Sequence, residues 1–295
     1  MLTVKFWGTR GSIPCPGPDT VIYGGNTTCI EMRADGRLII IDLGTGVRSL
    51  GKSIITSDLK KFGRIDADIF ITHTHWDHIM GFPSFAPIYI PGTKLRIMGP
   101  VTFEENSLED IFKTQLSYRY WPVRLDEMAA DIQFKQINET TLDLGGGLTV
   151  TSKFLNHPIS CLGYRFEYKG NSAVIVFDHE PYYNIFAADL SASVEGEIAA
   201  TEENEKINRF MQDADLVIHD AQYSDDEYSR FVGWGHASCT RVVDSARKAN
   251  VKKLVLFHHD PSHTDEQLER IEKEYVNPSN PPEVVMAKEG MELTV

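Results

Sequence analysis

Long apolar runs are missing from this 295-residue sequence. No stretch approaches the roughly 20 consecutive apolar residues that cross a bilayer. The first residues lack the apolar core of a secretion signal, and the segment 2–7 has the character of a strand instead. We therefore expect a cytoplasmic protein with no membrane partner.

Cysteine is scarce as well. The four cysteines are far apart and none belongs to a C-x-x-C pair: Cys15, Cys29, Cys161 and Cys239. Scattered thiols of this kind favour a reduced cytosolic protein over one held together by two disulfides.

Positive charge is in deficit. The chain has 29 Lys and Arg against 42 Asp and Glu, a formal net charge of −13. Such a balance argues against broad electrostatic capture of nucleic acid. It does not exclude an anionic substrate, because bound divalent cations reverse the field locally. Otherwise the composition, 42% hydrophobic and 24% charged, is that of a globular protein.

Histidine is concentrated in one place. His73, His75, Asp77 and His78 lie within six residues, directly after the apolar run 67–72. That run predicts a buried strand, so the cluster begins where a strand ends and a loop opens. Imidazole and carboxylate ligands suit zinc, manganese or iron. A solvated His-rich loop is the alternative, but such tracts are typical of low-complexity tails. The cluster predicts a metal site.

Metal-capable residues also follow other expected strands. Hydrophobic patterning predicts strands at 2–7, 28–32, 38–42, 67–72, 147–155, 164–168, 173–177, 216–218 and 253–257, with helices from 47 to about 61 and at 104–116, 201–212, 238–249 and 264–275. Five of these strands are followed by a histidine or aspartate: His73, His157, Asp178, His219 and His258. Strands buried between helices bring such ends together at one rim.

These residues suffice for two metal ions. His73, His75 and His157 are candidates for a first site, and a second can be built from Asp77, His78 and His258, with Asp178 as the bridge. Asp77 is also a candidate catalytic residue. Two divalent ions are expected, zinc first, with manganese or iron as alternatives.

The segment from about 100 to 140 differs from the rest of the chain in its pattern of residues. Its helical pattern at 104–116 is followed by an aromatic loop at 118–122. It is either a substrate-side insertion or a helix packed outside the sheet. We expect the chain, 1–295, to form one domain around it.

The motif series resembles the metallo-β-lactamase superfamily. The series is His73-x-His75-x-Asp77-His78, followed in order by His157, Asp178 and His258. The resemblance implies an α/β fold, a four-layer αββα sandwich of two mixed sheets flanked by helices, with the metals at one edge. Asp178 stands where true β-lactamases carry cysteine, which is similar to the phosphodiesterase and nuclease branch.

Two further segments are similar to the tRNA 3′-end processing endonucleases (tRNase Z). Residues 218–222 resemble their H-E-A-T motif and residues 235–238 their H-S-T motif. The resemblance implies a proton-relay pair of Asp220 and His236; alternatively, Asp220 caps a turn and His236 is a surface residue. Asp220 replaces the usual Glu, and no Gly/Pro-rich arm for gripping tRNA is found.

Several residues near these motifs remain open. The opening segments 6–14 and 24–29 resemble cyclic-phosphate and cyclic-nucleotide phosphodiesterases, and Arg10 is a candidate phosphate contact or a plain surface charge. The spacing Leu254-x-Leu256-x-His258 favours His258 over His259 as the last ligand. His179 and His263 are expected to be ordinary polar surface.

Together these features predict a dinuclear metal-dependent hydrolase. The first expectation is a phosphodiesterase for a small cyclic or linear phosphodiester, with no broad nucleic-acid surface and, by family analogy, a homodimer. The alternatives are a tRNase Z-like endoribonuclease and a non-catalytic metal-binding or sensing module. A proton relay argues against the last, because binding alone needs no acid for a leaving group.

Overall fold

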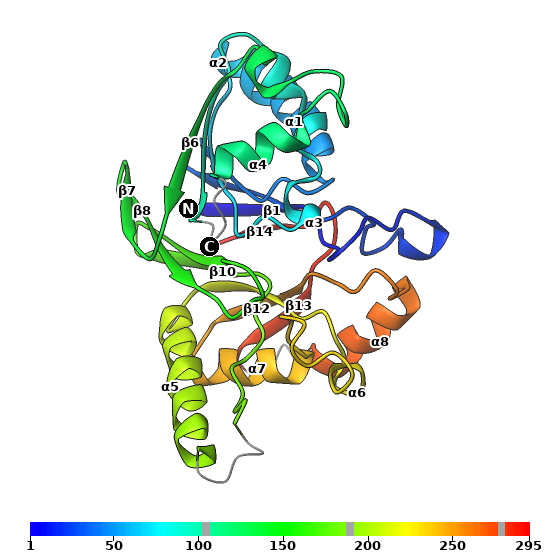
Figure 1. Ribbon diagram of the computed structural model, residues 1–295, viewed down its shortest axis with the longest axis vertical. Helices are drawn as coiled ribbons and strands as arrows, with labels where there is room; N and C mark the ends of the chain where they lie inside the picture. The colour runs from blue at the N-terminus through cyan, green and yellow to red at the C-terminus, as the bar shows by residue number, and fades with distance from the viewer. Residues whose placement is uncertain (102–106, 187–191, 277–280) are drawn as a thin grey trace.

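Two β-sheets pack face to face, with helices on both outer faces (Figure 1). The computed structural model describes residues 1–101, 107–186, 192–276 and 281–295. Each sheet has seven strands, in the orders β14-β1-β2-β3-β4-β5-β6 and β13-β12-β11-β10-β9-β8-β7. The four-layer αββα sandwich expected from the sequence is confirmed.

The first sheet is antiparallel on one side and parallel on the other. Its strands are β14 (Glu292–Thr294), β1 (Leu2–Gly8), β2 (Cys29–Ala34), β3 (Arg37–Ile41), β4 (Asp66–Phe70), β5 (Lys94–Pro100) and β6 (Asp131–Ile137). Neighbours from β14 to β3 are antiparallel, and those from β3 to β6 are parallel. The sheet is therefore mixed, as predicted.

The second sheet repeats this plan. Its strands are β7 (Thr141–Gly145), β8 (Leu148–Phe154), β9 (Leu162–Tyr168), β10 (Asn171–Val176), β11 (Leu216–Asp220), β12 (Lys253–Phe257) and β13 (Glu283–Met286). Neighbours are antiparallel from β7 to β10 and parallel from β10 to β13. Sequence patterning placed the end of β11 at residue 218, but the strand continues through Asp220.

The helices cover the outer faces of the sheets. They are α1 (Val47–Ile54), α2 (Lys60–Phe62), α3 (Trp76–Ile79), α4 (Leu108–Gln115), α5 (Ser193–Met211), α6 (Asp225–Tyr228), α7 (Cys239–Lys248) and α8 (Asp265–Tyr275). A π-helical turn, Ile55–Leu59, joins α1 to α2, and 3₁₀ turns lie at Pro18–Thr20, Phe82–Ser84, Ala86–Tyr89 and Leu125–Glu127. Helix α5 begins earlier than the predicted residue 201. No helix in the described ranges is both long and apolar enough to cross a membrane.

The cores explain why these strands read as apolar runs. Strands β3 and β12 are buried on both faces, because one face meets the opposite sheet and the other meets helices. Between the sheets, Phe177 stacks on Phe257 with ring centroids 4.5 Å apart. The described residues contain no disulfide, since all four cysteines are free thiols.

The described residues between 107 and 140 contribute one helix and one strand next to β5. Strand β6 pairs in parallel with β5, and α4 packs outside it through Phe112, whose ring lies 5.4 Å from that of Phe134 on β6. Helix α4 lies outside the first sheet, and the expectation of a substrate-side insertion at about 100–140 stays a prediction. The first residues of the predicted helix, 102–106, lie outside the described residues.

Three strand ends turn sharply where the site is built. Asp42, Asp178 and His258 follow β3, β10 and β12, with positive φ angles of 58°, 49° and 62°. Non-glycine residues seldom adopt this left-handed conformation, and such strain concentrates at functional sites. Each turn aims its side chain toward the space above the parallel strand ends.

Candidate metal centre and proton relay

One group of ligand atoms comes from four different segments. His73 follows β4, His75 immediately precedes α3, His157 follows β8 and Asp178 follows β10. Nδ1 of His75 lies 3.0 Å from Nε2 of His73 and 3.0 Å from Nε2 of His157. Asp178 Oδ2 is 3.4 Å from Nε2 of His73. The structure thus brings together the three histidines predicted for a first metal.

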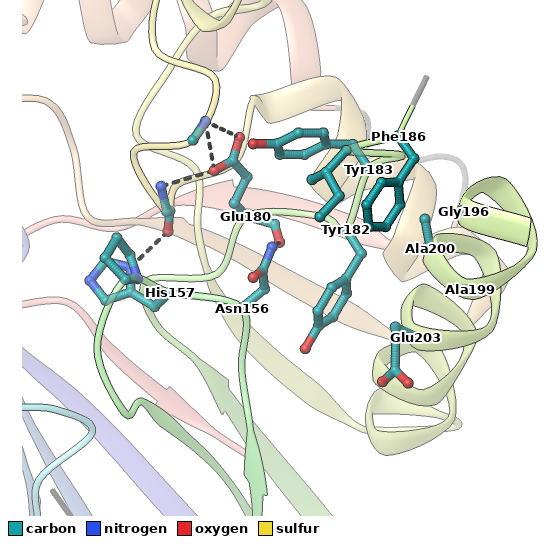
Figure 2. A pocket seen from close by; sticks show the side chains of 14 residues that line it. Asn156, His157, Glu180, Tyr182, Tyr183, Phe186, Gly196, Ala199, Ala200 and Glu203 are labelled. Carbon is teal, nitrogen blue, oxygen red and sulfur yellow. Dashed lines mark hydrogen bonds between the residues drawn. The ribbon is translucent and has the colours of Figure 1, made fainter. Parts of the chain in front are cut away.

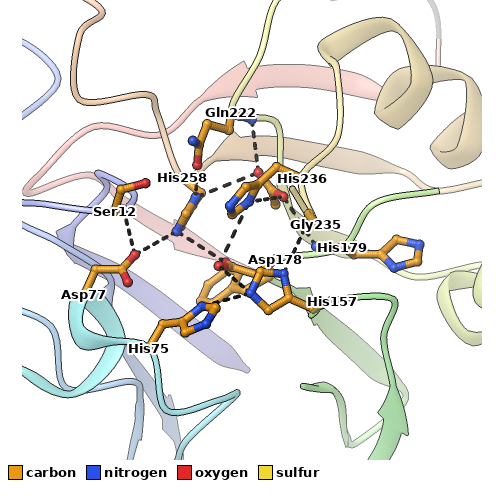
Figure 3. A network of polar contacts seen from close by, with 12 residues as sticks. Ser12, His75, Asp77, His157, Asp178, His179, Gln222, Gly235, His236 and His258 are labelled. Carbon is orange, nitrogen blue, oxygen red and sulfur yellow. Dashed lines mark hydrogen bonds and ion pairs between the residues drawn. The ribbon is translucent and has the colours of Figure 1, made fainter. Parts of the chain in front are cut away.

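The second group shares Asp178. Nε2 of His78 lies 3.2 Å from Asp77 Oδ2 and 3.4 Å from Asp178 Oδ2. Nε2 of His258 lies 3.2 Å from Asp77 Oδ2 and 3.3 Å from Asp178 Oδ1 (Figure 3). Asp178 therefore faces both groups, which is the position predicted for a bridge.

Both groups have dimensions that fit a metal ion. Within each, one atom per residue lies within 4.8 Å of all the others. Tetrahedral zinc with bonds of about 2.0–2.1 Å would place its ligand atoms about 3.3 Å apart. In the described part of the chain, the buried Asp178 Oδ1 has no hydrogen-bond partner. Unprotonated nitrogens packed this closely repel one another unless a cation lies between them.

Hydrogen bonds behind the rings fix which nitrogen faces inward. Nδ1 of His78 donates to Asp42 Oδ2 at 2.7 Å, and Nδ1 of His258 donates to Gln222 Oε1 at 2.9 Å. Nδ1 of His157 donates to the carbonyl of Gly235 at 3.1 Å. Each Nε2 then keeps its lone pair for the centre. Sequence reasoning missed all three partners, although Asp42 ends a predicted strand and Gln222 lies within a quoted motif.

Electrostatics favour a cation at the centre. Burial lowers the pKa of His157 to about 4 and that of His73 well below its ordinary value. Both rings are therefore neutral and can offer a lone pair to a metal ion. Burial alone would raise the pKa of Asp178, but the surrounding imidazoles hold it well below the usual range. Burial also opposes the charged form of His78, yet nearby carboxylates raise its pKa well above normal, so they stabilise a cation at this ring, either a proton on Nε2 or a metal ion bound there in its place.

The predicted proton-relay pair is assembled beside this centre. Nδ1 of His236 donates to Asp220 Oδ2 at 3.0 Å, and both side chains are buried. Burial disfavours the charged form of the His236 ring, but the Asp220 carboxylate stabilises that form more strongly and raises the pKa of His236 to about 9. The ring stacks on His258 with centroids 5.0 Å apart. Asp220 also accepts a bond from the Gln222 amide, so it caps the turn as well.

The family model described as the beta-lactamase superfamily domain matches residues 37–259. The chain belongs to the beta-lactamase superfamily. The matched range contains every residue of both ligand groups and of the relay pair.

Curated relatives of the chain include several proteins named ribonuclease Z. Ribonuclease Z of Sulfurisphaera tokodaii is 25% identical, with 90% of each chain covered, and ribonuclease Z of Clostridioides difficile is 26% identical, with 89% of each chain covered. Among solved structures, the short form of human tRNase Z superposes with a TM-score of 0.65 at 20% identity, covering 99% of this chain and 98% of the other. This last likeness concerns the fold alone.

The relatives correct one expectation from the sequence. Their name denotes enzymes that act on RNA, so the expectation of a small substrate and no broad nucleic-acid surface is wrong. The expectation of a small substrate rested on the resemblance of segments 6–14 and 24–29, and that of no nucleic-acid surface on the net charge of −13, which counts residues wherever they lie in the molecule. Substrate capture depends instead on the local field, which bound divalent cations would reverse at this edge of the sheets.

Two histidines that follow or end strands lie outside the centre. His219 is the penultimate residue of β11, so its side chain points away from that of Asp220 and its ring lies 5.9 Å from that of His179. Its expected convergence with the other strand ends is wrong. Nε2 of His259 donates to the Ala287 carbonyl at 2.8 Å, which leaves His258 as the residue in the ligand group.

Three residues expected at the surface are buried. His179 accepts the amide of Asn156, and His263 donates to Glu227 at 2.9 Å. Arg10 is fully buried, and its guanidinium donates to the carbonyls of Gly24, Asp260 and His263. Arg10 therefore ties loops together from a buried position and is not a surface charge.

Glu180 is a further residue that sequence reasoning missed. Its buried carboxylate accepts the amides of Gly233 and Gly235, at 2.8 and 3.0 Å, and the Tyr228 hydroxyl at 2.8 Å. Gly235 has a φ of 89°, and a Cβ there would lie 2.3 Å from Nδ1 of His157. Glu180 thus fixes the loop that supports His157 and carries His236.

We expect Glu180→Gln to weaken zinc binding by about 10- to 100-fold, the usual effect of losing a partner behind a ligand. The glutamine side chain places its own N–H donors against the backbone N–H groups of the loop. Gly235 then no longer holds His157 in place. Competition with a chromogenic chelator measures the affinity. The control is Glu31→Gln, which removes a buried carboxylate bonded to Trp7, far from the centre. Equal affinities in both variants would contradict this role for Glu180.

Proposed function

We propose that this protein is a metal-dependent endoribonuclease of the ribonuclease Z kind, which cleaves precursor tRNA near its 3′ end. The observation that carries the proposal is the buried Asp220–His236 pair, 3.0 Å apart, beside ligand groups that share Asp178. Relatives named ribonuclease Z, aligned over about 90% of the chain, support it.

The ligand groups define the roles proposed for the metal-binding residues. His73, His75, His157 and Asp178 would hold one ion, and Asp77, His78, His258 and Asp178 the other. Nitrogen and carboxylate ligands without cysteine suit zinc. Two such ions, when bound, would lower the pKa of water and neutralise charge on a phosphodiester.

The relay residues supply the second half of the chemistry. Cleavage of an RNA backbone releases a ribose oxygen, which is a poor leaving group unless it receives a proton. His236 is positioned to donate that proton, while Asp220 orients the ring and stabilises its charged form. A non-catalytic metal-binding module would not need this pair.

Incubation with a precursor tRNA that carries a 3′ trailer tests the proposal. We expect cleavage at one site, loss of cleavage after chelation, and its return on addition of zinc. Bis-p-nitrophenyl phosphate serves as a control for a working centre. Hydrolysis of this control by a protein that leaves the precursor intact would overturn the assignment to RNA.

A further inference from the structure

A pocket of about 500 Å³ opens beside the candidate metal centre (Figure 2). One end is lined by His157 and Gly235, which also belong to the centre and its support. The other end lies between α5 and the segment 182–186. The volume is within the range of about 300–1,000 Å³ that is usual for sites holding small organic groups.

Aromatic rings form one wall of this pocket. Phe186 lies at the end away from His157, and the Tyr183 side chain extends toward Gly233; Tyr183 and Phe186 are 42% and 50% exposed. The opposite wall is α5, which presents the small residues Ala199 and Ala200. The Phe186 ring contacts α5 at Gly196, where a Cβ would lie 3.3 Å from its Cδ2, and half of the residue stays exposed for a flat group to stack on.

The charges of the pocket exclude a phosphate. None of its described lining residues is Lys or Arg, and the charged ones are Glu180 and Glu203. Glu180 already accepts the amides of Gly233 and Gly235, so these amides are not free to bind an anion. Phosphate sites need cationic side chains or free amides. The pocket therefore suits an uncharged aromatic group.

We propose that this pocket holds one unpaired nucleobase next to the scissile phosphate, stacked on Phe186 and Tyr183. The inference rests on the proposed function, because it takes RNA as the substrate. A phosphodiester at the metal centre lies against His157, so the neighbouring nucleoside can reach the rings directly. Proteins commonly bind single-stranded RNA by stacking bases on exposed aromatic side chains.

The test combines an abasic scan of the RNA with a matched pair of variants. Precursor tRNAs each lack one base near the cleaved bond, and kcat/KM is measured for every substrate. With the wild-type protein, we expect one abasic position to lower kcat/KM by about 5- to 150-fold, the loss of one stacked base. Phe186→Ala should lower kcat/KM for the intact RNA by a similar factor. With this variant, removing the base should then lower kcat/KM little further.

Phe62→Ala is the matched control, because Phe62 is 52% exposed and lies on α2, in the opposite helical layer. It should retain the full abasic effect, and Tyr183→Ala should repeat the result of Phe186→Ala. Two results would overturn the pocket assignment even if the protein cleaves RNA. Either no abasic position lowers kcat/KM, or the losses from the abasic position and from Phe186→Ala multiply as independent effects. A wild-type protein that hydrolyses bis-p-nitrophenyl phosphate but no RNA would overturn the proposed function, and this inference with it.

Discussion

Replacing Asp178 with Asn is expected to abolish binding of the metal pair and to lower phosphodiester hydrolysis by about three powers of ten or more. Asp178 is the residue common to both ligand groups, and its two oxygens face His78 and His258. Asparagine keeps the shape but loses the negative charge and one oxygen ligand. Metal content by elemental analysis should fall from two ions per chain toward none.

Thermal unfolding provides a readout that is independent of activity. Zinc at about 100 times its dissociation constant stabilises a folded protein by about 2.7 kcal/mol per site. The Tm of the wild-type protein should therefore rise with zinc, while that of Asp178→Asn should not respond. Asp126→Asn, the same change at an exposed position, should behave as the wild type. Two firmly bound ions in Asp178→Asn would contradict the bridging position.

One part of the site was predictable because its residues lie close together in the sequence. His73, His75, Asp77 and His78 lie within six residues, so the sequence alone places four metal-capable side chains together. His157, Asp178 and His258 required the expectation that strands buried between helices end at one rim, and the structure brings these residues together there. Their roles as metal ligands remain predictions.

The supporting partners were not predictable in the same way. Asp42 reaches His78 because residue 42 takes a left-handed turn after β3, and no local pattern specifies that turn. Glu180 depends on a loop more than 50 residues further along the chain. His219 shows the opposite error, because β11 continues through Asp220, so His219 lies inside the strand and its side chain points to the face opposite that of Asp220.

The fold was predictable where strands are long and apolar, and less so at the edges of the sheets. β14 has three residues and forms only by pairing with β1, so its own sequence carries little signal. β6 alternates clearly, but it follows a helix whose pattern suggested an insertion. Its assignment depends on the parallel register with β5, which is a tertiary property.

Replacing His236 with Ala is expected to slow cleavage of RNA by about 10²- to 10⁴-fold, the usual contribution of a general acid. The ribose oxygen must then leave without a proton. A p-nitrophenolate leaves readily unprotonated, so hydrolysis of bis-p-nitrophenyl phosphate should fall by less than about tenfold. Asp220→Asn should show the same selectivity to a smaller degree, because the ring remains but loses its orienting charge.

This dependence on the leaving group separates proton donation from a structural role. A variant that merely disturbs the metal ligands would slow both substrates alike, as Asp178→Asn should. His263→Ala is a suitable control, since His263 is also buried and bonded to a carboxylate, that of Glu227, but lies outside both ligand groups. His263→Ala should leave the ratio of RNA cleavage to bis-p-nitrophenyl phosphate hydrolysis unchanged. Equal losses on both substrates in His236→Ala would show that His236 is not the acid.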